Sequence, residues 1–250
     1  MSKHYFISDL HLGAAYITHP RAHEQRVTQF LDAVKRDAAS LWLLGDVLDY
    51  WFEYRNVVPR GHVRFFGKLA ELADSGIEIH WFTGNHDVWL RDYLRDEIGL
   101  TVHHSSTTVD LDGHRIFLAH GDDVGRQPTM YRFTRWCFHN PVCQWLYAAI
   151  HPRWATAVAT GWSASNRTRR KPARKRPPTG NAFARLLEFA EAHHRQCPDV
   201  DTFIFGHLHM ARLETIASGQ AQLVCLGEWL NQDTYAVLDN GVLELNHFTS

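Results

Sequence analysis

Five short apolar runs along the chain each end in a cluster of aspartate, histidine or asparagine. Each run is short and mostly apolar, as a buried strand is. In an open α/β sheet the carboxyl ends of the strands border the functional crevice, so side chains that follow different strands can meet there. The pattern therefore predicts one polar site assembled from distant segments. The clusters are Asp9-Leu10-His11, Gly45-Asp46-Val47-Leu48-Asp49, Gly84-Asn85-His86-Asp87, His120-Gly121-Asp122 and Gly206-His207-Leu208-His209.

The order of elements indicates a layered α/β fold. Arg21–Ala39 and His62–Ser75 carry apolar residues at helical spacing between the first strands, which is typical of βαβ units. The last 50 residues instead alternate short strands with Gly- and Asn-rich turns. We expect two packed sheets with flanking helices. The expected strands are His4–Ser8, Leu41–Leu44, Ile77–Phe82, Arg115–Ala119, Thr202–Phe205, Ala211–Ile216, Ala221–Leu226, Thr234–Leu238 and Val242–His247.

A segment of different composition, about residues 122–180, lies between these parts. Met130–Trp162 is crowded with aromatic residues, and seven basic residues follow within Arg167–Arg176, where prolines interrupt any helix. We interpret residues 1–250 as one domain with an inserted helical lid, followed by a mobile basic loop. Trp51 and Phe52 are expected to pack beneath the site, and His193 and His194 to lie at the surface.

The composition disfavours several other classes of protein. A net charge of -1 provides no overall field to recruit nucleic acid. The four cysteines form no CxxC pair and have apolar neighbours, as buried free thiols do. The first residues lack a signal-peptide pattern, and no run approaches the ~20 apolar residues of a membrane span. We therefore expect a cytoplasmic protein without disulfides.

The side chains in the five clusters are typical metal ligands, and 18 histidines are many for this length. Mixed imidazole and carboxylate ligands suit Mn²⁺, Fe²⁺ or Zn²⁺ better than Ca²⁺. Two such ions ~3.5–4 Å apart can clamp phosphoryl oxygens and activate a water molecule. Asp46 has two carboxylate oxygens and can bridge them. One DxH or HxH motif alone is weak evidence, but burying five polar clusters without ligands would be costly.

The ordered set of motifs resembles the calcineurin-like metallophosphoesterase superfamily and covers residues 9 to 209. The resemblance implies a four-layer αββα sandwich and two divalent ions, often Mn²⁺. His86 would stabilise charge on the scissile phosphate or protonate the leaving group, and Asp87 would orient its ring. The implied first-metal ligands are Asp9, His11 and His209, the second-metal ligands are Asn85, His120 and His207, and Asp46 bridges.

Within this superfamily the chain resembles the enzymes of lipid A biosynthesis that cleave the pyrophosphate of UDP-2,3-diacylglucosamine. They release UMP and 2,3-diacylglucosamine 1-phosphate. The similarity lies in the length, the Asp-Leu-His-Leu-Gly start, the inserted segment, and the Leu-Gly-Glu-Trp-Leu-Asn sequence before the last strands. His86 stands where the best-known branch has arginine, and Leu208 where it has threonine, so the chain is closer to a second, more divergent branch.

The inserted segment favours a nucleotide-linked lipid substrate and peripheral contact with the cytoplasmic face of the inner membrane. Its aromatic residues can line a slot for acyl chains, and its basic run can face anionic headgroups. Alternatively, the basic run is a solvated loop, the substrate is a soluble nucleotide or phosphodiester, or the fold is a non-catalytic scaffold. Nucleic acid is disfavoured, because no companion fold signature is present. The expected substrate contacts are Asn85, His86, Ser163, Asn166, Arg167, Arg170 and His207.

Overall fold

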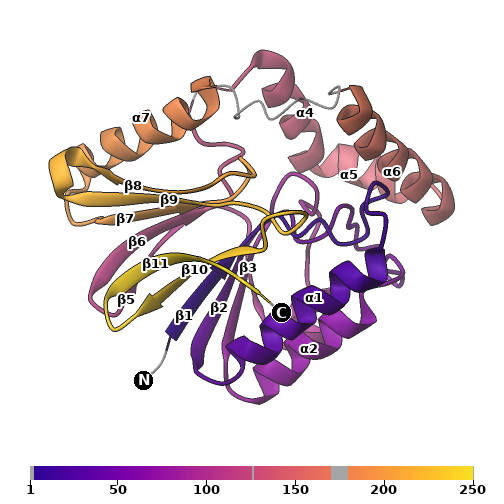
Figure 1. The fold of residues 1–250 in the computed structure, drawn as a ribbon. Coiled ribbons are helices and arrows are strands. Elements are labelled where there is room, and N and C mark those ends of the chain that lie inside the picture. Colours follow the sequence, from indigo (N-terminus) through magenta and orange to yellow (C-terminus); the bar gives the residue numbers. More distant parts are fainter. Residues whose placement is uncertain (1–2, 126, 170–179, 250) are drawn as a thin grey trace.

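A computed structural model describes residues 3–125, 127–169 and 180–249 of the chain. Within these residues two mixed β-sheets pack face to face (Figure 1). The first sheet has the order β11-β10-β1-β2-β3-β4, with β1 to β4 parallel. Its strands are β1 (Lys3–Ile7), β2 (Ala38–Leu44), β3 (Glu78–Phe82), β4 (Thr101–His103), β10 (Thr234–Asp239) and β11 (Val242–His247).

The second sheet has the order β5-β6-β7-β9-β8, in which β6, β7 and β9 are parallel. The chain crosses back to the first sheet between β9 and β10, through the turn at residues 227–233. The strands are β5 (Thr107–Leu111), β6 (His114–Ala119), β7 (Thr202–Phe205), β8 (Ala211–Ile216) and β9 (Ala221–Leu226), with a 3-10 turn η1 (Ala217–Gly219) between β8 and β9.

Helices cover the outer face of each sheet, which completes the expected αββα layering. Alternate residues of β1 and β2 explain the layers: Ile7 and Leu43 face α1 and α2, whereas Phe6 and Leu44 face the second sheet. Leu186 and Ala190 of α7 pack on the other side of the second sheet. The helices are α1 (Pro20–Val34), α2 (Val63–Asp74), α3 (Tyr93–Ile98), α4 (Thr129–His139), α5 (Pro141–Ala148), α6 (Pro152–Arg169) and α7 (Gly180–Gln196).

The α4–α6 segment (Thr129–Arg169) falls within the predicted insertion and lies apart from both sheets (Figure 1). It is attached to the sandwich by an aromatic cluster in which Tyr147 and Phe138 pack against Phe52 and Trp89. The Tyr147 hydroxyl also lies 3.2 Å from that of Tyr50. The segment therefore contacts the loops that follow β2 and β3, where the predicted site lies.

Some sequence expectations were wrong in detail. The helix expected at Arg21–Ala39 ends at Val34, and Ala38 already belongs to β2, where it pairs with Lys3. Helix α7 was not expected, and His194 on it is buried rather than at the surface. The predicted basic loop begins within α6, and residues 170–179 lie outside the described residues. Trp51 and Phe52 are fully buried, as expected.

Candidate metal centre

The loops that follow β1, β2, β3, β6 and β7 bring the predicted ligands together at one end of the sandwich. Donor atoms within 4.8 Å of one another form three groups in the described part of the chain. His11 and Asp46 each belong to two of them, so the three groups are contiguous. They are Asp9 with His11 and His209, His11 with Asp46 and His86, and Asp46 with His120 and His207.

The first metal group is formed by Asp9, His11 and His209. Asp9 Oδ1 lies 3.3 Å from His209 Nε2, and the Nε2 atoms of His11 and His209 are 3.4 Å apart. Two donors that each lie about 2.1 Å from one cation at a tetrahedral angle are about 3.4 Å apart. Asp46 Oδ2 lies 3.9 Å from His11 Nε2, at the border of this group. The spacing therefore fits a single cation.

The second metal group is formed by Asp46, His120 and His207, and Asp46 also belongs to the group with His11 and His86. Asp46 Oδ2 lies 3.5 Å from His120 Nε2, and the rings of His120 and His207 are 5.2 Å apart, centroid to centroid. Asn85 borders the same loops, and its Oδ1 atom is buried without a hydrogen-bond partner among the described residues. The carboxylate of Asp46 is therefore placed to bridge two cations.

The tautomer of His120 leaves the lone pair of its Nε2 atom free to bind a cation. His120 Nδ1 lies 2.8 Å from the carbonyl oxygen of Leu44, which only accepts, so Nδ1 carries the proton. His120 Nε2 and Asp9 Oδ1 are buried and have no hydrogen-bond partner in the described ranges. Buried polar atoms left without partners are costly, at roughly 1–3 kcal/mol each. These orphaned atoms fit bound cations.

The backbone at the ligands is strained, because five predicted ligands have a positive φ of 47 to 64°. A non-glycine residue in this region costs of order 1–3 kcal/mol, and such residues cluster at functional sites. The neighbouring glycines permit close approach of the loops. A Cβ atom on Gly45 would lie 2.6 Å from His120 Nδ1. The five ligands are Asp9, His11, Asp46, His207 and His209.

The Asp87 carboxylate does not orient His86, contrary to the sequence expectation. It is fully buried and accepts hydrogen bonds from the backbone N–H groups of Gly84, Val47 and Asp46, at 2.7, 2.9 and 3.2 Å. It ties the loops after β2 and β3 together, and it also accepts a hydrogen bond from the indole N–H of Trp81 at 3.2 Å. Because the Asp87 carboxylate accepts these hydrogen bonds from two loops, its role is structural.

Asp49 is the residue that contacts His86. His86 Nδ1 lies 3.0 Å from the Asp49 carbonyl oxygen and 3.4 Å from its Oδ1 atom, so Nδ1 carries the proton. The same Oδ1 atom lies 3.3 Å from Nδ1 of His11. No role for Asp49 was predicted from the sequence. The sequence signal for such a role is its place as the second aspartate of Gly-Asp-x-x-Asp, three residues after Asp46.

Burial and neighbouring charges shift the pKa values of three of these groups. Burial raises the pKa of Asp9 to about 6. Although burial opposes it, the charges of His120 and His86 hold the pKa of Asp46 well below its ordinary value. Burial, and then the neighbouring His120, lower the pKa of His207 to about 4, so its imidazole is neutral and available as a ligand.

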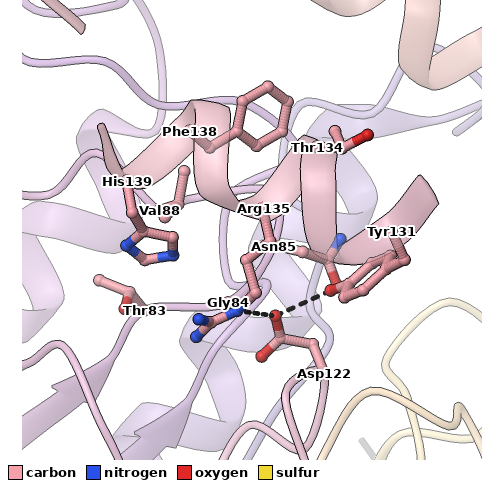
Figure 2. A pocket seen from close by; sticks show the side chains of 10 residues that line it. All are labelled: Thr83, Gly84, Asn85, Val88, Asp122, Tyr131, Thr134, Arg135, Phe138 and His139. Atoms are coloured by element: carbon pink, nitrogen blue, oxygen red, sulfur yellow. Dashed lines mark hydrogen bonds and ion pairs between the residues drawn. The ribbon is translucent and has the colours of Figure 1, made fainter. Parts of the chain in front are cut away.

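A pocket is lined by residues of the loops after β3 and β6 and of helix α4 (Figure 2). Asn85 from the loop after β3 and Tyr131 and Arg135 from α4 are among its lining residues. The Tyr131 hydroxyl donates to Asp122 Oδ2 at 2.8 Å, and Arg135 bonds Asp123 Oδ2 at 2.9 Å. The α4–α6 segment is thus tied to the loop that carries His120.

The predicted substrate contacts divide into two sets. Asn85, His86 and His207 lie at the metal centre, as described above. Ser163, Asn166 and Arg167 are on α6, but their side chains are outside the described part of the chain, and Arg170 lies outside the described residues altogether. Their contacts with substrate stay predictions.

The fold and the site define a class of protein. The calcineurin-like phosphoesterase family model matches residues 3–211, so the chain belongs to that family. It is a metal-dependent hydrolase, and the three clusters of donor atoms are candidate ion-binding groups.

Proteins similar to this chain include two UDP-2,3-diacylglucosamine hydrolases. A UDP-2,3-diacylglucosamine hydrolase of Porphyromonas gingivalis is 42% identical over 98% of this chain and 97% of its own. A second, of Ralstonia nicotianae, is 30% identical over 90% and 83% of the two chains. A solved structure described as a novel archaeal phosphodiesterase shares the fold, with a TM-score of 0.50, 14% identity and 98% of each chain covered.

Proposed function

We propose that this chain hydrolyses the pyrophosphate of UDP-2,3-diacylglucosamine to UMP and 2,3-diacylglucosamine 1-phosphate. The observation that carries the proposal is the 42% identity to a UDP-2,3-diacylglucosamine hydrolase over nearly the whole of both chains. That similarity covers the α4–α6 segment as well as the metal loops. The pocket lined by Asn85 and α4 supports the proposal, because it is lined by both a proposed metal ligand and a helix of the predicted insertion.

The proximity of the donor atoms supports the proposed metal ligands. Asp9, His11 and His209 would hold one divalent cation, His120 and His207 a second, and Asp46 both. Asn85, whose buried Oδ1 has no hydrogen-bond partner among the described residues, would complete the second set. Mn²⁺ is the proposed ion, since mixed imidazole, carboxylate and amide ligands suit it. The cations would supply Lewis-acid activation of water and neutralise phosphate charge.

The chain's own groups would act on the phosphate and the leaving group. With the Nδ1 proton donated toward Asp49, Nε2 of His86 is the ring atom left to exchange a proton with the reaction. The His86 ring packs edge-on against His11, with centroids 4.8 Å apart, which keeps it beside the metal groups. His86 is therefore the proposed group that stabilises developing charge or protonates the leaving oxygen.

The substrate is tested by incubating the purified chain with Mn²⁺ and UDP-2,3-diacylglucosamine and measuring UMP. UDP-N-acetylglucosamine is the matched control, since it keeps the pyrophosphate but lacks the acyl chains. We expect UMP from the lipid substrate only. Cleavage of bis-p-nitrophenyl phosphate without release of UMP from the lipid would reject the substrate and retain the hydrolase.

We also propose that the α4–α6 segment rests on an anionic membrane surface, where the lipid substrate is held. Nine of the fourteen exposed large apolar side chains in the described residues belong to this segment, including Trp136, Trp145 and Trp154. Tryptophan favours membrane–water interfaces, and the basic run at Arg167–Arg176 can add attraction to anionic headgroups. None of the helices in the described ranges is long and apolar enough to cross a membrane.

Vesicle flotation tests the membrane proposal. Replacing Trp136, Trp145 and Trp154 with glutamine should abolish flotation with phosphatidylglycerol vesicles. The matched control replaces Val63, Leu213 and Val242, which are exposed apolar residues elsewhere on the molecule, and should float like the wild type. Equal flotation of the two triple variants would contradict the assignment of this surface.

A further inference from the structure

Two backbone carbonyl groups in the turn at residues 9–11 accept hydrogen bonds from residues outside the metal centre. The turn at residues 9–11 has a positive φ at both Asp9 and His11. The Asp9 carbonyl accepts a hydrogen bond from the backbone N–H of Trp229 at 3.2 Å. The Leu10 carbonyl accepts one from Nε2 of His23, a buried residue of α1, at 2.8 Å. Both peptide groups between the two ligands are thus fixed.

A side-chain relay connects these two contacts. His23 Nδ1 lies 3.1 Å from Nη2 of Arg26, and a guanidinium group only donates, so Nδ1 accepts and the proton stays on Nε2. Arg26 also donates to the Trp229 carbonyl at 2.9 Å and to Asp233 Oδ1 at 2.9 Å. The relay therefore fixes the tautomer with which His23 holds Leu10.

The turn at residues 227–233 reaches the third ligand of the same group. Gln232 Nε2 donates to the carbonyl oxygen of His209 at 3.2 Å, and His209 also has a positive φ of 52°. The buried Glu228 carboxylate accepts from two backbone N–H groups inside the turn, at 2.9 and 3.1 Å, which stiffens it. One turn thus contacts the backbone of both Asp9 and His209.

We propose that His23, Arg26 and the turn at residues 227–233 form a positioning unit that sets cation affinity at the first metal group alone. Their hydrogen bonds fall on the backbone of residues 9, 10 and 209. Among the described residues, none of those bonds reaches Asn85, His120 or His207. The inference rests on the proposed ligand assignment, and it adds residues that do not touch metal or substrate.

Mn²⁺ binding to the metal-free full chain tests the unit, by calorimetry and by electron paramagnetic resonance. In His23→Leu the donor to Leu10 is lost, and one of two Mn²⁺ equivalents should bind about 10- to 100-fold more weakly, with the other unchanged. The spectrum at low Mn²⁺ should change from a coupled pair to an isolated ion. In His23→Gln the side-chain amide can still donate to Leu10, so both affinities should be retained.

A matched control and a second variant complete the experiment. His194→Leu removes another buried histidine, whose ring nitrogen lies 2.8 Å from the Val200 carbonyl oxygen, and should leave both affinities unchanged. Gln232→Leu should reproduce the single-site loss and decides the matter if His23→Leu fails to fold. Equal weakening of both equivalents, or of neither, would overturn the positioning unit. A wild-type chain that binds no Mn²⁺ would overturn the ligand assignment as well.

Discussion

Replacing Gly84 with alanine would place a methyl group against the carboxylate that both metal groups share. A Cβ atom on Gly84 would lie 2.3 Å from Asp46 Oδ1 and 2.4 Å from the Asp46 backbone nitrogen. The φ of Gly84 is outside the left-handed range, so alanine brings no backbone strain of its own. The substitution therefore displaces Asp46 without adding backbone strain at residue 84.

The size of the effect follows from these distances. Ordinary contacts begin near 3.4 Å, so Asp46 and Gly84 must separate by about 1 Å. Asp46 Oδ1 also accepts from the backbone N–H of His86 at 2.9 Å, and that bond would be disturbed as well. A displacement of this size typically costs about 10²-fold in rate, and overpacking costs about 1–3 kcal/mol of stability.

The assay is hydrolysis of bis-p-nitrophenyl phosphate at saturating Mn²⁺, together with metal content and urea unfolding. Gly67→Ala is the matched control, because a Cβ atom there meets nothing within 4 Å and the residue lies within α2. It should keep full activity and gain about 0.5–1 kcal/mol of stability. If Gly84→Ala retained wild-type kcat/KM and bound two ions, the proposed bridging role of Asp46 would be wrong.

Three further outcomes are expected. Asp49→Asn should lower kcat about 10- to 100-fold at saturating Mn²⁺, since the His86 ring loses its carboxylate partner; an unchanged kcat would remove Asp49 from the mechanism. Chelation by EDTA should abolish activity and lower Tm reversibly, because ions at 100 times Kd contribute about 2.7 kcal/mol; an unshifted Tm would argue against resident cations. Burial, and then His80 and His104, lower the pKa of His103 to about 4. The unfolded chain therefore binds this proton first, so stability falls as pH drops from about 6.5 toward 4, and His103→Gln should lose less stability than the wild type in urea titrations.

The sequence predicted well which side chains lie together at the site, because each follows a strand, and strand ends are recognisable from short apolar runs. The predicted strand at Ala221–Leu226 agrees with β9 to the residue. The end of α1 was missed because Lys35–Asp37 continues a helix-compatible pattern, and only pairing of Ala38 with Lys3 converts the next residues into a strand. That pairing is a long-range contact, which local periodicity does not contain.

Contacts between side chains of distant loops were also beyond sequence reasoning. Asp87 follows His86 directly, and proximity in the chain made it the expected partner of that ring. In the structure the Asp87 carboxylate bonds the backbone of the loop after β2 instead. The His86 ring contacts Asp49, which follows a different strand. Helix α7, by contrast, could have been found, since Phe183, Leu186, Leu187 and Ala190 have helical spacing.

The left-handed backbone at five ligands has a further consequence. Glycine suits such conformations best, whereas the residues found there are aspartate and histidine, which the proposed metal chemistry requires. The folded chain without ions thus retains conformational tension and unsatisfied buried charge at the same place. Cation supply in the cell would then control how long this protein persists as well as how fast it works.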